Sequence, residues 1–122
     1  MNKSYAIVSA ILFGIVALLH LIRGFLGWEV AIGDYMLPVV DSGAVFGVAI
    51  CLAVWGIRGS RSYAVVSATL FSLVALLHLY RVLITQTVVT IDALTVPVTA
   101  SWVGFVVSGA LSVWGFLSYR SL

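Results

Sequence analysis

The chain carries nearly the same sequence twice. Residues 4–23 and 62–81 match at 15 of 20 positions, and residues 38–61 and 97–120 match at 10 of 24. The offset between matching residues is 58 in the first alignment and 59 in the second. The chain is therefore one domain, residues 1–122, made of two tandem repeats, residues 4–61 and 62–120. Both halves are expected to adopt one architecture, and this constrains the fold more than any other feature.

Each repeat contains two long apolar segments, which makes four in the chain. Each has 19 or 20 residues, close to the roughly 20 that cross the hydrocarbon core of a bilayer. The composition, 63% hydrophobic and 8% charged, is typical of a membrane protein. Helices are expected because backbone groups in lipid must find their partners within the segment. The predicted fold is an all-α membrane protein with helices at residues 5–23, 39–57, 63–81 and 98–117.

The charged residues predict the orientation in the cell membrane. Most basic residues lie at the termini and in the short connector between the repeats, which places these parts in the cytoplasm. They are Lys3, Arg58, Arg61 and Arg120. All acidic residues lie at the opposite, extracytoplasmic end: Glu29, Asp34, Asp41 and Asp92. Because each repeat has two spans, the repeats are parallel, related by a pseudo-two-fold axis along the membrane normal. The charge pattern does not indicate a nucleic-acid partner.

Aromatic residues near the segment ends predict belts at both membrane surfaces. The set expected at the cytoplasmic surface is Tyr5, Trp55, Tyr63, Trp114 and Tyr119. The set expected at the other surface is Trp28, Tyr35, Tyr80 and Trp102.

The connector within each repeat has the pattern of a β-hairpin. Apolar residues flank Gly33-Asp34 in the first copy, and β-branched residues flank Asp92-Ala93 in the second. Pro38 and Pro97 follow, where proline is tolerated at the start of a helix. The two hairpins are expected to pair or pack as a cap over the extracytoplasmic helix ends. The change of offset predicts one extra residue in the second copy, between Arg81 and Thr87.

Small residues four apart suggest close helix packing. The second segment has Gly43 and Gly47, and the fourth has Gly104 and Ser108. Such spacing lets helices approach closely in lipid. It is compatible with a self-association surface and with packing inside the four-helix bundle. Cys51 is interpreted as a small apolar packing residue.

The polar residues with most chemical potential are two His-x-x-Arg pairs, His20 with Arg23 and His78 with Arg81. In one hypothesis His20 and His78 are the axial ligands of a b-type haem, and the two arginines bind its propionates. In the other, the pairs are structural: histidine bonds across helices, and arginine reaches the interface or pairs with one of the acidic residues. The sequence leaves both open.

A catalytic role has little support in the sequence. No carboxylate lies in the middle of an apolar segment, and no nucleophile–base spacing or glycine-rich phosphate loop is present. Passage of a small solute between the halves is a third alternative, but it requires a polar-lined pore, and Ser9, Ser67 and Ser72 are few for such a lining.

The first repeat contains LLHLIRGFLGWEVAIG, followed by Pro38 and Ser42. This pattern resembles a group of short, uncharacterised prokaryotic membrane proteins. The resemblance implies a multi-pass membrane protein and no particular activity. The second repeat keeps the Leu-His-Leu-x-Arg element, Pro97 and Ser101, and lacks the Gly-Trp element. Because small residues recur at packing spacings and no catalytic set is present, we expect a non-enzymatic structural or accessory protein in the lipid bilayer, assembling with itself or with a larger membrane complex.

Overall fold

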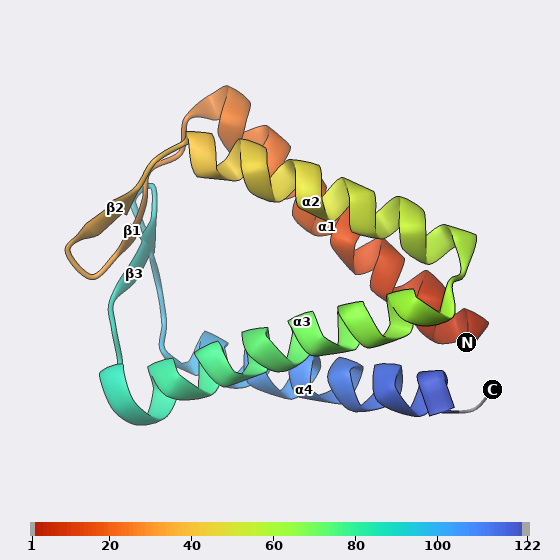
Figure 1. The fold of residues 1–122 in the computed structure, drawn as a ribbon. Helices are drawn as coiled ribbons and strands as arrows, with labels where there is room; N and C mark the ends of the chain where they lie inside the picture. The colour runs from red at the N-terminus through yellow and green to blue at the C-terminus, as the bar shows by residue number, and fades with distance from the viewer. Residues whose placement is uncertain (1, 121–122) are drawn as a thin grey trace.

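The structure is a computed structural model that describes residues 2–120. Two helix pairs form a V, and a small β-sheet bridges the open end (Figure 1). All four helices are long and apolar enough to cross a membrane. In chain order the elements are α1 (Lys3–Leu26), β1 (Val30–Ile32), β2 (Tyr35–Leu37), α2 (Val40–Arg58), α3 (Arg61–Tyr80), the π-helical segment η1 (Arg81–Thr85), β3 (Val89–Ile91), β4 (Leu94–Val96) and α4 (Thr99–Arg120).

The helix ends follow from local sequence. At the start of α1, the Asn2 side chain accepts hydrogen bonds from the backbone amides of Ser4 and Tyr5, which have no partner within the helix. Gly27 ends α1 and Gly59 ends α2, with φ values of 69° and 71°. A residue without Cβ adopts this left-handed conformation at little cost. The chain therefore turns tightly at the vertex of the V, at the connector between α2 and α3.

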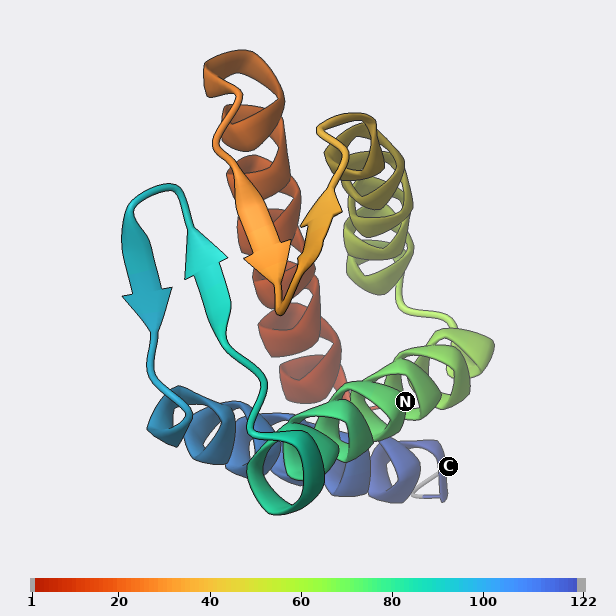
Figure 2. The same cartoon turned by 90° about the vertical axis from the view of Figure 1, so that its left-hand side faces the viewer.

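The connectors form two hairpins that join into one antiparallel sheet of order β2-β1-β3-β4. The hairpins meet along β1 and β3, where Ala31 faces Thr90. The pairing is extended by two further bonds, from the Gly33 amide to the Val88 carbonyl and from the Asp92 amide to the Glu29 carbonyl. The sheet lies across the open end of the V in Figure 2. It therefore connects the two helix pairs at the end where they are far apart.

The extra residue of the second half is accommodated by η1. In the first half the Gly27 amide bonds to the carbonyl of Arg23, four residues earlier. In the second half the Gln86 amide bonds to the carbonyl of Arg81, five residues earlier. This is the π-helical pattern, in which one turn holds an additional residue. Gln86 takes a left-handed φ of 46°, as Gly27 does, so the chain leaves the helix in the same way in both halves.

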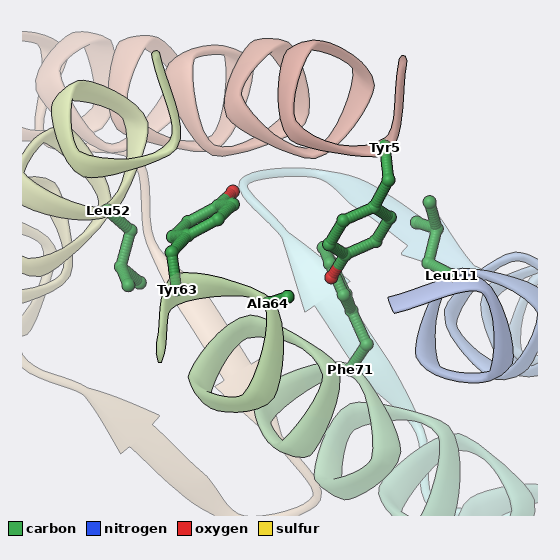
Figure 3. Close-up of a cluster of buried hydrophobic side chains, with 6 residues drawn as sticks. All are labelled: Tyr5, Leu52, Tyr63, Ala64, Phe71 and Leu111. Carbon is green, nitrogen blue, oxygen red and sulfur yellow. The ribbon is translucent and has the colours of Figure 1, made fainter. Parts of the chain in front are cut away.

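The core at the vertex contains two tyrosines, each of which reaches from its own helix pair into the other pair (Figure 3). The Tyr5 hydroxyl of α1 lies 2.7 Å from Ser67 Oγ of α3, and the Tyr63 hydroxyl of α3 lies 2.8 Å from Ser9 Oγ of α1. Ser67 Oγ also donates to the Tyr63 carbonyl at 2.7 Å, so the Tyr5 hydroxyl is the donor to Ser67. Both tyrosines are fully buried. Their polar atoms are satisfied where water is absent.

Two glycines make room for these rings. A Cβ at Gly56 would lie 2.7 Å from the Tyr63 ring, and a Cβ at Gly115 would lie 2.6 Å from the Tyr5 hydroxyl. Real Cβ atoms do not approach other atoms so closely. The tyrosine of each helix pair therefore depends on a glycine in the other pair.

The expected aromatic belt on the cytoplasmic side is wrong at two positions. Tyr5 and Tyr63 lie in the core, whereas Tyr119 is exposed. The belt rule considers only the distance of an aromatic residue from the segment end. The serine one turn after each tyrosine supplies a buried hydrogen-bond partner for the tyrosine of the other helix pair. Small residues on the opposing helices supply the space for the rings.

The two small-residue motifs have different surroundings in the structure. A Cβ at Gly104 would meet the His78 ring, and Ser108 is buried, so this pair packs inside the chain. A Cβ at Gly43 or Gly47 would meet no side chain and no other element within 4 Å. The two glycines therefore leave an open face on α2, and Gly43 also borders the cavity between α1 and α2. Cys51, expected in packing, is also exposed on α2.

Replacing Gly56 by alanine is expected to lower the free energy of unfolding in detergent by about 1–3 kcal/mol, because the methyl group overlaps the Tyr63 ring. Gly109→Ala is the control: a Cβ there meets nothing within 4 Å, so this change should be neutral or raise stability slightly. Thermal or denaturant unfolding measures both. Equal effects of the two substitutions would contradict the packing described here.

Candidate functional site

The two His-x-x-Arg pairs lie where the helices meet the sheet. His20 and Arg23 are in the last two turns of α1, and His78 is in the last turn of α3. Arg81 begins η1. The helix ends that carry these four residues lie at the open end of the V, in two separate helix pairs (Figure 1).

Arg23 fastens the first hairpin to the helices. Its Nε donates to the Trp28 carbonyl at 3.0 Å, just before β1, and Nη2 donates to the Leu37 carbonyl at 2.8 Å, at the end of β2. Its Nη1 donates to Ser42 Oγ at 2.8 Å, in the first turn of α2. Arg23 is only 6% exposed. One buried guanidinium thus holds both ends of the hairpin and the next helix.

Arg81 repeats this arrangement in the second half. Its Nε donates to the Thr87 carbonyl at 3.0 Å, and Nη2 donates to the Val96 carbonyl at 2.8 Å. Its Nη1 lies 3.0 Å from Ser101 Oγ and 3.5 Å from the Pro97 carbonyl. The π-helical turn lengthens the chain between Arg81 and Thr87 and still keeps the first of these bonds.

These contacts change one expectation about the arginines. The structural hypothesis included pairing of Arg23 or Arg81 with Glu29, Asp34, Asp41 or Asp92. The hydrogen bonds that the structure gives the two guanidinium groups go to carbonyl and serine oxygens instead. A fork of five N–H donors suits several carbonyls at once.

The two histidines have different environments. His20 Nδ1 lies 3.0 Å from Ser42 Oγ, the oxygen that also accepts from Arg23. The ring of His78 lies against Gly104 of α4, with Nε2 2.5 Å from the position of a Cβ there. The first half has Val45 at the position equivalent to Gly104. Because valine carries a Cβ and two methyl groups, the place that the His78 ring takes in the second half is not open to His20 in the first.

The structure does not bring His20 and His78 together. His20 lines a cavity of about 200 Å³ between α1 and α2, with Phe25 and Phe46. His78 lines a different cavity of about 510 Å³, and the two cavities share no lining residue. A haem with two histidine ligands needs both rings on opposite sides of one iron. The shared haem site stays a prediction. Neither of these two cavities is lined by both histidines.

Two serines that matter at the site belong to the pattern shared by both halves, but that pattern by itself gave them no role at the site. Ser42 and Ser101 are buried and accept from Arg23 and Arg81. A signal was present, since each lies four residues after the proline that both halves share. Ser9 and Ser67, considered as pore lining, are buried against the tyrosines. Within residues 2–120, no three histidine, cysteine or acidic side chains lie close enough to hold a metal ion.

Replacing Arg23 by alanine is expected to lower the free energy of unfolding by at least about 2 kcal/mol, because three bonds from a charged donor are lost. Amide exchange should rise across β1 and β2 more than across β3 and β4, which Arg81 still holds. Arg58→Ala removes an exposed arginine and should change stability by less than about 0.5 kcal/mol. Uniform loss of exchange protection in both hairpins after the Arg23 change would argue against a local clamp.

The chain was compared with protein-family models, curated proteins and solved structures, and none of the three comparisons found a match. The function proposed below therefore rests on the residues and geometry of this chain.

Proposed function

We propose that the protein is a small multi-pass integral membrane protein with a non-enzymatic, structural or accessory role, and that it assembles with itself through α2. The observation that carries the proposal is the open glycine face of α2, at Gly43 and Gly47. The polar residues at the helix ends support it, because Arg23 and Arg81 bind backbone and serine oxygens that hold the architecture.

The surface of the helices supports a membrane setting. Only 28–33% of the most apolar stretch of each helix is buried within the chain. Large apolar side chains are exposed on all four helices, including Ile11, Val48, Leu77 and Val103. So much exposed apolar surface is far beyond what soluble proteins carry and requires lipid or a partner. We place the chain in the cytoplasmic membrane.

The proposed orientation has both termini in the cytoplasm and the sheet outside. Arg58, Arg61 and Arg120 lie at the vertex end of the helices, the end that the basic bias assigns to the cytoplasm. Asp34 and Asp92 lie in the hairpin turns at the opposite end. The two halves then share one orientation and form a parallel repeat, with the hairpins as an extracytoplasmic cap.

Cysteine labelling in intact cells tests this orientation. In a Cys51→Ala background, Asp34→Cys should react with a membrane-impermeant maleimide, whereas Ser60→Cys should react only after the cells are opened. Both positions lie between regular elements, and the Ser60 side chain makes no capping hydrogen bond to α3. The opposite labelling pattern would invert the topology, and labelling of neither position after lysis would contradict a multi-pass arrangement with exposed connectors.

The open glycine face of α2 fits a second copy of the chain. Gly43 and Gly47 are one turn apart, and no side chain of the same chain covers them. Contact between lipid and a flat helix surface stabilises little. Contact between this surface and the same glycines on a second α2 lets the two helix backbones approach closely. Identical faces meeting about a two-fold axis give a closed dimer.

Substitution of the open glycines tests self-assembly. Gly43→Ile and Gly47→Ile should convert an oligomer into a monomer in mild detergent, measured by light scattering or native mass spectrometry. Gly109→Ile adds the same side chain at an open position on α4 and should leave the oligomer intact. A wild-type chain that is strictly monomeric, with no partner retained on purification, would contradict the proposal. Retention of a different protein, lost in the Gly47 variant, would assign the face to a larger complex.

A further inference from the structure

His78 borders a cavity at the open end of the V. It lies between the end of α3 and the sheet, and its volume is about 510 Å³, within the range of ligand pockets. In the first half, the equivalent arginine is almost fully buried and the equivalent histidine bonds to Ser42. In the second half, Arg81 is partly exposed and the histidine ring lies over Gly104.

Most of the cavity wall is apolar. It is made by side chains from α3, η1, α4 and both hairpins, and its polar groups include Arg81, bonded to Ser101, and His78 one turn before Arg81. The apolar part of the wall includes Ile32, Val74, Leu77, Val89, Ile91 and Val96. The polar part includes His78, Arg81 and Ser101. Such a division suits a ligand with a long apolar body and a compact polar head.

The polar end has unused hydrogen-bond capacity. A guanidinium carries five N–H donors, and the structure gives Arg81 four bonds, one of them long at 3.5 Å. Within residues 2–120, His78 makes no side-chain hydrogen bond, although it lines the cavity. Arg81 keeps one N–H without a hydrogen bond and the His78 ring keeps its own, and N–H donors of this kind suit the oxygens of a carboxylate.

The charge of the cavity selects the head group. Arg81 is the one charged side chain among the described residues that line it, so a single negative charge balances the site. The spacing along α3 places the body of the ligand, because Leu77 and Val74 lie one and two turns before Arg81. We propose that this cavity binds a single-chain amphiphile with a carboxylate head, a fatty acid, with the head at Arg81 and His78 and the chain along α3.

Equilibrium binding of radiolabelled palmitate to the delipidated full-length protein tests the proposal. Binding should be saturable, and unlabelled palmitate should compete. Acetate lacks the chain and cetyl alcohol lacks the charge, and each should compete at least about tenfold more weakly, since a charged hydrogen bond or burial of a long chain is worth a factor of ten or more. Dodecyl phosphate separates a preference for carboxylate from a preference for any anion.

Matched variants in the two halves locate the site. His78→Ala should weaken palmitate binding about tenfold, and Val74→Trp should abolish it by filling the cavity. Their counterparts at equivalent positions, His20→Ala and Val16→Trp, should bind as the wild type does. Melting temperatures report on folding. If Val74→Trp fails to fold, His78→Ala still tests the site, because that ring makes no hydrogen bond within the described chain.

Three outcomes would overturn the proposal. Non-saturable palmitate uptake, unchanged by Val74→Trp, would mean partition into the lipid-facing surface. Equal competition by cetyl alcohol would remove the role of Arg81 and His78. Equal losses in the first-half and second-half variants would remove the distinction between the halves. These results do not depend on self-assembly, which the α2 variants test separately.

Discussion

The exchange of Tyr5 and Tyr63 between the helix pairs is the contact on which the rest of the structure depends. Each ring enters the opposite pair at a glycine, and each hydroxyl bonds to a serine of that pair. Rings of Phe13 and Phe71 stack at a centroid distance of 5.2 Å beside this contact. In lipid, where apolar surface alone gives helices no reason to associate, tight packing and buried hydrogen bonds supply the attraction. Both occur together at the vertex.

The other end of the molecule needs a different solution, because the helix pairs diverge. A two-stranded hairpin is marginal by itself in water. Here each hairpin is fastened to its helices by an arginine and paired with its counterpart along β1 and β3. The arginine does this well because its donors reach both ends of the hairpin at once. The sheet limits the separation of the helix pairs at the open end, and the tyrosines hold the pairs together at the vertex.

The sequence is a good guide to the elements and a poorer one to the contacts. Long apolar runs predict four helices, and turn residues such as Gly33-Asp34 predict strands where β1 and β2 lie. The offset between the repeats locates the extra residue near Arg81, but its form as a π-helical turn requires hydrogen-bond geometry. The roles of Tyr5, Tyr63 and the two arginines depend on carbonyls and glycines far away in the chain. Patterns read along one segment do not contain that information.

The contacts between the halves come in exchanged pairs, so they have the form of a symmetric interface between two identical subunits. In a dimer of separate chains, a substitution on one side appears on the other side as well. Here both sides belong to one polypeptide, joined through Gly59, and equivalent positions change independently. Gly104 corresponds to Val45 in this comparison, and Gln86 corresponds to Gly27. Covalent linkage therefore allows the two halves to differ, with Arg23 almost fully buried and Arg81 partly exposed beside a cavity, a difference that two copies of one sequence cannot encode.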